Sequence, residues 1–313
     1  MGKTIYFAKI NINDDKVFKL YEGSITVKDI MTKLSVAISN GISYKRLINY
    51  TIDGEEQVEE QDFAFTAINK LEEEVSDVLV GGVIKTSKIY INKVDNKTGD
   101  KTTTAVDNDE IIQFCFYPEK EIVAFDSTKR FGYQTFCRAF EGLLSKASML
   151  NDEDNTCFKV SLLTKGVSLD NIKNELRKIK NIETIKIDII PPNPNQDILD
   201  AIKKNAEKQL KNMEEGRITE KSIVFKSRDK RGLNPESEEI VNELNNISAI
   251  HSKLEVEDSI ANGYVEVEAK SSDGSIYNTN DSKIIKYRLP RGVVGDKLFA
   301  DYCRDKIISL VKW

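Results

Sequence analysis

The residue types best suited to chemistry lie late in the chain, where Asp258 precedes the triplet Glu268-Ala269-Lys270. Some Mg²⁺-dependent nucleases place an aspartate and a Glu-x-Lys triplet at neighbouring strand ends, so that two carboxylates hold the ion and the lysine orients or activates the attacking water. Apolar and polar residues also alternate from Val265 to Lys270, which is typical of an ordinary half-exposed antiparallel strand. Asp258, Glu268 and Lys270 are therefore the candidate catalytic residues if the protein is a nuclease. Mg²⁺ is expected only in that case, and otherwise no cofactor and no metal ion is expected.

Two later segments concentrate positive charge, one from Arg217 to Arg231 and one from Lys283 to Arg291. Lysine and arginine clustered around an aromatic residue, here Phe225, are typical of proteins that bind a phosphate backbone without reading bases. Charge runs of this kind also occur on solvated loops and strand faces. If the two segments meet on one surface, the residues predicted to bind nucleic acid are Lys221, Lys226, Arg228, Lys230, Arg231, Lys283, Lys286, Arg288 and Arg291.

Two smaller motifs have simple structural explanations. The motif AFDSTKR places Asp126, Ser127, Lys129 and Arg130 between a strand and a helix, where an anion can bind, but Ser127 or Thr128 as a helix N-cap explains it equally well. The single histidine, His251, is expected at a helix end, because no serine or cysteine nucleophile motif accompanies it.

The composition limits the class of protein. The 313 residues include 46 basic and 51 acidic side chains, a formal charge of −5, so any binding of nucleic acid needs a local basic patch. The four cysteines form no CxxC pair, and three of them lie in apolar stretches, IIQFCFY, QTFCRAF and NTCFKV, so buried free thiols are expected rather than disulfides or a zinc site. No apolar run approaches the roughly 18 residues that cross a bilayer, and no secretory signal opens the chain, so a cytoplasmic protein without membrane insertion is expected.

Residues 1–150 are expected to form an antiparallel sheet plus helices. Lys3–Ile12 is rich in Ile, Tyr and Phe and predicts a strand, and the segment SITVKDIMTKLSVAISNG has apolar residues at helical spacing. Antiparallel strands are predicted between residues 78 and 126, interrupted by a polar hairpin tip from Asp95 to Asp109. The next helix should pack an apolar stripe on this sheet, made of Phe131, Phe136, Phe140, Leu143 and Leu144.

Residues 151–313 are expected to form a second domain, a β-α-β-α region with helices packed on a mixed sheet, which makes the whole chain an α+β protein. The motif PPNPNQD predicts a rigid turn in which Asn195 or Asp197 caps the next helix. A hairpin of GYVEVEAK and SKIIKYRLP follows, and then a helix from Gly295 to Trp313. The apolar stripe of that helix belongs either to the core or to a protein interface, and it consists of Phe299, Ile307, Ile308, Val311 and Trp313.

From about Phe63 onward, the order of segments resembles a family of bacterial proteins of unknown function that is often found among phage-defence genes. The resemblance begins with the Gly81-Gly82 strand, IIQFCFYPEKEIVAFDS and FGYQTFCRAFEGLL, continues through IKIDIIPPNPNQD, and ends with ANGYVEVEAKSSDG. It covers about two thirds of the chain and implies a role in defence against phage or in a toxin-like module. It assigns no functional residues.

These observations favour a component of a bacterial anti-phage defence module that binds nucleic acid through its basic segments. Two alternatives stay open: the Mg²⁺-dependent nuclease, and an assembly subunit that binds another protein of the module or a second copy of itself.

Overall fold

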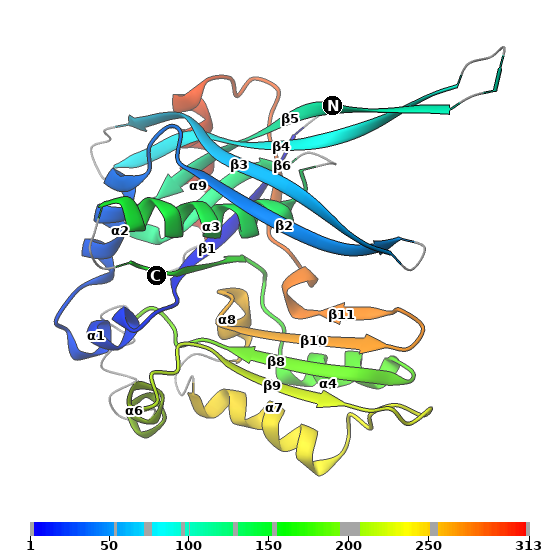
Figure 1. The fold of residues 1–313 in the computed structure, drawn as a ribbon. Helices are drawn as coiled ribbons and strands as arrows, with labels where there is room; N and C mark the ends of the chain where they lie inside the picture. Colours follow the sequence, from blue (N-terminus) through cyan, green and yellow to red (C-terminus); the bar gives the residue numbers. More distant parts are fainter. Residues whose placement is uncertain are drawn as a thin grey trace.

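The computed structural model describes residues 3–52, 55–71, 77–94, 98–99, 101–127, 131–151, 155–194, 207–250 and 256–310. Its strands form two separate sheets (Figure 1). The first sheet has the order β12-β1-β6-β5-β4-β3-β2, with β7 also paired to β1, and the second has the order β11-β10-β8-β9. The α+β class predicted from the sequence is therefore confirmed.

The first sheet draws its strands from both halves of the chain. They are β1 (Thr4–Ile12), β2 (Ser43–Ile52), β3 (Glu55–Leu71), β4 (Val78–Val94), β5 (Lys101–Tyr117), β6 (Ile122–Ser127), β7 (Phe158–Leu162) and β12 (Lys286–Arg288). All their pairings are antiparallel. One edge of β1 pairs with β6, and its other edge pairs with β12 near the start of β1 and with β7 near its end.

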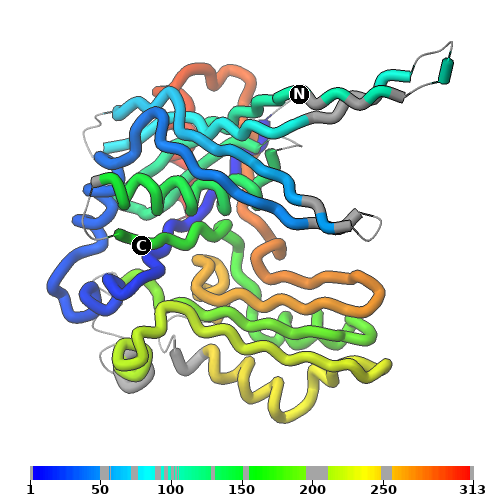
Figure 2. The backbone as a smooth tube through the Cα atoms, viewed as in Figure 1, coloured from blue at the N-terminus to red at the C-terminus, as the bar shows by residue number. Residues whose placement is uncertain are grey.

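This sheet forks where β3 leaves β4. The β3–β4 ladder stops at Asp62 and Thr86, whereas β2 pairs with β3 as far as Ile52 and β4 pairs with β5 as far as Val94. Two two-stranded ribbons therefore extend separately from the body (Figures 1 and 2). Within the hairpin tip expected over 95–109, residues 101–109 form strand, because the Thr- and Val-containing start of β5 pairs with β4 despite its polarity.

Helices cover both faces of the first sheet. The helices α1 (Lys16–Glu22), α2 (Val27–Ala37) and α3 (Tyr133–Asn151) pack on one face, and α9 (Asp296–Leu310) packs on the other. A capping box fixes the start of α2, because Thr26 accepts from the backbone N–H of Asp29 while the Asp29 carboxylate accepts from that of Thr26. The predicted burial of the stripe is confirmed, since all five residues are fully buried, although Phe131 lies just before α3 and only the other four belong to the helix. The short helix α1 was not predicted.

The apolar stripe of α9 is largely core. Phe299 and Ile307 are buried against the first sheet, whereas Ile308 is 62% exposed. Val311 and Trp313 lie outside the described residues. The part of the stripe that the structure describes therefore supports core packing more than docking.

The second sheet contains β8 (Ile182–Ile189), β9 (Lys221–Lys226), β10 (Val265–Ser271) and β11 (Ile276–Asn278). One face packs on helices α4 (Leu169–Lys178), α7 (Glu238–Ile250) and α8 (Val256–Ala261), while α6 (Glu207–Glu215) lies between β8 and β9 in sequence. Its described pairings are all antiparallel, so the expected mixed sheet is not what forms. The expected hairpin is also different: β10 pairs with Ile276–Asn278, and Lys286–Arg288 crosses to β1.

The expected boundary at residue 150 does not coincide with the division between the sheets. Strands β7 and β12 and helix α9 follow that residue, yet they pack with the first sheet. The second sheet and its helices are built from residues 169–278 of the described chain.

A buried amide joins the two sheets. Asn193 follows β8, and its side-chain nitrogen donates to the carbonyl of Ile10 at 3.0 Å and to Oε2 of Glu121 at 2.6 Å. Its side-chain oxygen accepts from the backbone N–H of Ile12 at 2.9 Å. The motif expected as a turn is thus buried from residue 191 to residue 194, and its two cap candidates, Asn195 and Asp197, lie outside the described residues.

The carboxylate of Glu141 on α3 gives the fold a pH dependence. It accepts from the backbone N–H of Val160 at 3.1 Å, and burial raises its pKa. The folded state therefore holds this proton more tightly than the unfolded state does, so the stability contribution of Glu141 falls as the pH rises from the unfolded pKa of about 4.3 through the raised folded pKa.

We expect Glu141→Gln to raise the melting temperature near pH 8 and to change it little near pH 4, because glutamine keeps an acceptor for Val160 without the buried charge. Thermal unfolding of both proteins across this range measures the effect. A difference in melting temperature that is the same at every pH would contradict it.

Within the described residues, no helix has the length and apolar character needed to cross a membrane. None of the four cysteines forms a disulfide, and Cys115, Cys137 and Cys303 are buried as expected. The expectation of burial is wrong for Cys157, which is exposed just before β7.

Candidate nucleic-acid interface

Three connections meet at one end of the second sheet. The backbone N–H of Ser227, just after β9, donates to the carbonyl of Glu183 at 2.9 Å, and that of Leu233 donates to the carbonyl of Ile182 at 2.7 Å. The turn between β10 and β11 joins them, because Ser272 N–H donates to the Asn181 carbonyl at 3.1 Å. The loop after β9 is therefore held against the turn that precedes β8.

Gly232 permits this close approach. Its φ is +75°, a value that favours glycine, and a Cβ atom here would lie 2.5 Å from the backbone nitrogen of Ile182. The loop conformation thus depends on the absence of a side chain at this position.

We call this end of the second sheet the basic end, and define it by Lys180, Lys226, Arg228, Lys230 and Arg231. All five side chains are exposed. Arg231 pairs with Asp229, with Nε 3.2 Å from Oδ1, and hydrogen bonds from Arg231 lower the pKa of that carboxyl. None of the other four cations forms an ion pair in the part of the chain that the structure describes.

The nearest acidic turn is internally satisfied. Asp273, between β10 and β11, accepts from the hydroxyl of Ser271 and from the backbone N–H of Ser275 at 2.8 Å. Hydrogen bonds from Ser271 and Ser275 lower the pKa of Asp273 to about 2. This carboxylate is therefore charged at neutral pH and bound to its own turn.

Phe225 is partly buried against the core of the second sheet. It pairs with Ile185 in the β8–β9 ladder and packs into the core beneath α4 and α7. Alternation along β9 turns Phe225 toward this core, while Lys226 stays exposed.

The second basic segment lies on the other sheet. Lys286 and Arg288 belong to β12, which pairs with β1 at the edge of the first sheet, and Lys283 and Arg291 flank this strand. All four side chains are exposed. The structure thus places the two predicted segments on edge strands of different sheets, with β9 at one edge of the second sheet. Lys221 lies at the start of β9, at the opposite end of that strand from Lys226.

The nuclease candidates occupy different kinds of element. Asp258 lies in the first turn of helix α8, whereas the motif calls for a strand end. Glu268 and Lys270 lie on the open face of β10 and pair with each other at 2.9 Å. Asn278 of β11 donates to Glu268 at 3.5 Å and to Glu266 at 2.6 Å. The described residues contain no group of three acidic, histidine or cysteine side chains that could hold a metal ion.

The anion-site candidate after β6 has a structural role in its described part. Asp126 is buried, accepts from the backbone N–H of Gln113 at 2.9 Å and pairs with Lys3. Lys129 and Arg130 lie outside the described residues, as does His251.

A protein-family model for a domain of unknown function, DUF4747, matches residues 24–286. The chain belongs to the DUF4747 family. Membership of an uncharacterised family is therefore confirmed, but the match begins at residue 24, well before the start near Phe63 that the sequence resemblance predicted. The matched region includes strands β2 to β11, the basic end and the cations Lys283 and Lys286. Arg288 and Arg291 lie beyond its last residue, 286. A search of curated proteins finds no match to the chain.

Proposed function

We propose that this protein is a nucleic-acid-binding component of a bacterial anti-phage defence module, and that its basic end contacts the phosphate backbone. The observation that supports this most directly is the gathering of Lys180, Lys226, Arg228 and Lys230 by three hydrogen-bonded connections. Exposed cations without ion-pair partners in the described chain can exchange small counterions for phosphates without first breaking an internal contact. The defence role is supported by the resemblance described from the sequence.

Binding at the basic end would be independent of base sequence. Lysine and arginine contacts to phosphate position a protein on nucleic acid, whereas base reading needs groove contacts or stacking. Phe225 is partly buried against the core of the second sheet, which leaves only part of its ring for contact with a base. Affinity should therefore fall steeply with salt and differ little between oligonucleotide sequences.

We expect the triple variant Lys226→Glu, Arg228→Glu, Lys230→Glu to lose about tenfold or more in affinity for a labelled oligonucleotide at low salt. It should also show a shallower salt dependence, because log Kd changes with log salt by about 0.9 per phosphate contact on duplex DNA. Fluorescence anisotropy with single-stranded DNA, duplex DNA and RNA, between about 50 and 200 mM salt, measures both quantities.

The matched control is Lys286→Glu, Arg288→Glu, Arg291→Glu, which changes the net charge equally at the edge of the first sheet. Its affinity should stay near that of the unmodified protein. Equal losses in the two triple variants, or no salt-dependent binding by the unmodified protein, would overturn the proposed interface.

The defence role needs a separate test. Efficiency of plating for a phage panel should be compared on cells that carry the native locus and on cells whose locus encodes the basic-end triple variant. We expect the native locus to lower plating for at least one phage and the variant to restore it. Unchanged plating across the panel with the native locus would overturn this part of the proposal.

A further inference from the structure

A cavity of about 360 Å³ adjoins the basic end, between α4 and β11. The end of α4 and the residues that follow it form one wall, and the turn between β10 and β11 with the start of β11 forms the other. Its volume is in the lower part of the range of about 300 to 1,000 Å³ that is usual for small-molecule sites. We call it the β11 pocket, and define it by residues 175, 178–180, 273 and 275–277.

Lys180 belongs both to the β11 pocket and to the basic end. Its side chain is exposed and forms no ion pair in the part of the chain that the structure describes. The turn beside the pocket bonds to the next residue, since Ser272 N–H donates to the Asn181 carbonyl at 3.1 Å. Because β10 and β9 are the two neighbours of β8, the pocket side and the loop after β9 are about two strand spacings, or about 10 Å, apart.

The charges in the lining of the β11 pocket are balanced. Nζ of Lys178 lies 2.6 Å from Oε1 of Glu175. The Asp273 carboxylate is bound to its own turn, where it accepts from the backbone N–H of Ser275 at 2.8 Å. A phosphate inside the pocket would therefore meet no excess of positive charge, whereas an uncharged ring with polar edges could bond to groups of both signs.

The walls also offer apolar surface to such a ring. Ile179 and Tyr277 are partly buried, and Ile276 is 65% exposed. Burial raises the pKa of Tyr277 to about 12, so its hydroxyl keeps its proton at neutral pH. A planar heteroaromatic ring would cover these side chains with its faces and turn its polar edges to the hydroxyl and carboxylate groups of the lining.

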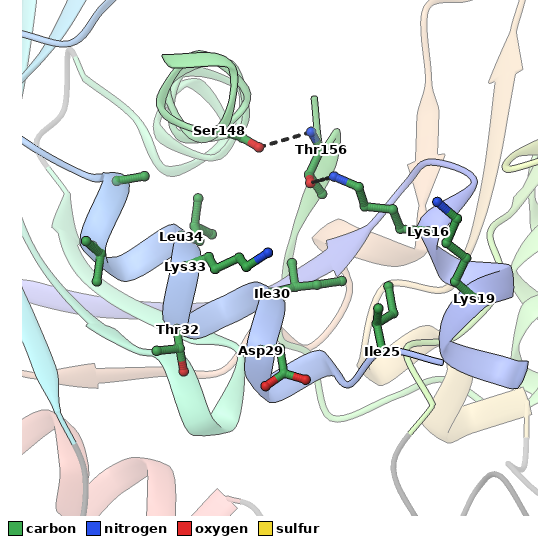
Figure 3. Close-up of a pocket in the computed structure, with 12 residues that line it drawn as sticks. Lys16, Lys19, Ile25, Asp29, Ile30, Thr32, Lys33, Leu34, Ser148 and Thr156 are labelled. Atoms are coloured by element: carbon green, nitrogen blue, oxygen red, sulfur yellow. Dashed lines mark hydrogen bonds between the residues drawn. The ribbon is translucent and has the colours of Figure 1, made fainter. Parts of the chain in front are cut away.

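A larger cavity of about 550 Å³ lies between α1, α2 and the C-terminal part of α3 (Figure 3). Its polar side chains are already engaged. Nζ of Lys16 donates to Oγ1 of Thr156 at 2.5 Å, Lys33 also has a partner, and Asp29 belongs to the capping box of α2. The smaller cavity, next to the unpaired ammonium group of Lys180, is therefore the better site for a ligand.

We propose that the β11 pocket takes an unpaired nucleobase, so that the protein prefers single-stranded to duplex nucleic acid. The phosphate of that nucleotide contacts Lys180, and phosphates further along the strand contact the cations of the loop after β9. A duplex would have to flip a paired base out of its stack, an energetic cost that a single strand largely avoids. Stacking in such a site tolerates any base, which agrees with binding that is independent of sequence. This inference rests on the proposed nucleic-acid binding and adds the class of strand that is bound.

The test is fluorescence anisotropy with oligonucleotides of about 12 nucleotides, a length within the usual range of single-strand sites. The set contains single-stranded DNA, single-stranded RNA, the blunt DNA duplex, and a DNA strand in which every nucleotide is abasic. The abasic strand keeps the phosphates and lacks the bases. At least one of the base-containing single strands should bind about fivefold or more tightly than both the duplex and the abasic strand.

The outcomes separate this inference from the proposed function. Duplex or abasic strand bound as tightly as the base-containing single strands would overturn the pocket inference and leave phosphate binding at the basic end intact. No salt-dependent binding of any oligonucleotide would overturn the proposed function and this inference with it.

Variants locate the base. Ile276→Ala and Tyr277→Leu should each weaken binding of the single strand about threefold or more and leave binding of the abasic strand unchanged. Ile276→Ala replaces an exposed side chain, so its fold should be unaffected. The matched control is Leu47→Ala, because Leu47 is also 65% exposed but lies on β2 of the other sheet.

Three results would reject the β11 pocket as the base site. They are unchanged single-strand binding in both pocket variants, an equal loss in Leu47→Ala, and an equal loss of the abasic and base-containing strands in the pocket variants. The basic-end triple variant should differ from the pocket variants, because it should weaken both kinds of strand by a similar factor.

Discussion

Replacing Asn193 by alanine is expected to lower the free energy of unfolding by about 3 to 5 kcal/mol. The substitution leaves the backbone N–H of Ile12 and the carbonyl of Ile10 without their side-chain partner, and Glu121 loses a donor as well. Each buried polar group left unsatisfied costs about 1 to 3 kcal/mol. Urea denaturation followed by circular dichroism measures the loss.

Two further variants make this result specific. Asn193→Asp should be at least as destabilising, because it removes both donors and puts a second carboxylate beside Glu121. Asn174→Ala on the exposed face of α4 should change stability by less than about 0.5 kcal/mol, although it removes an acceptor of Arg177. If Asn193→Ala is as mild as Asn174→Ala, the buried amide does not hold the two sheets together.

Replacing Phe140 by alanine is expected to cost about 3 to 5 kcal/mol of unfolding free energy. Its ring meets those of Phe114 and Phe136 at centroid distances of 5.1 Å and that of Phe65 at 5.6 Å. The variant loses both the transfer free energy of the ring and the contacts around the cavity it leaves. The same urea denaturation measures the change.

Leu150→Ala on the same helix is the control, because Leu150 is 71% exposed. It should alter the unfolding free energy by less than about 0.5 kcal/mol. A loss below about 1 kcal/mol in Phe140→Ala would show that α3 is not anchored on the sheet by this aromatic cluster.

Local periodicity was enough to predict the elements that carry the core. The stripe of α3 and the first strand follow patterns with periods of 3.6 and 2 residues, which depend only on neighbouring residues. The same reasoning failed for α1, whose seven residues are too few to show a helical period. It failed for the start of β5 because cross-strand pairing with β4 compensates a polar composition.

Strand partners could not be predicted from the same patterns. The alternation of polar and apolar residues in Lys286–Arg288 is compatible with pairing to β10 and equally with pairing to β1. Only the tertiary packing selects β1 as the partner. The mixed sheet and the boundary at residue 150 were inferred from element order, which does not determine pairing.

The candidate site was accessible to sequence reasoning only in part. The cations after β9 were visible as a charge run, but Lys180 was not, because it precedes β8 and reaches the basic end only through folding. The inward direction of Phe225 could have been inferred from its shared alternation with Ile223.

The pairing of β1 with β12 has a consequence for biosynthesis. Residues 4–6 and residues 286–288 are neighbours in one sheet, so this part of the sheet cannot close until residues 286–288 have been translated and released from the ribosome. Until then one edge of β1 has unpaired backbone groups, which are exposed to association with other nascent chains. A shortage of chaperone during translation should therefore reduce the yield of folded protein more than it affects refolding of the completed chain at low concentration.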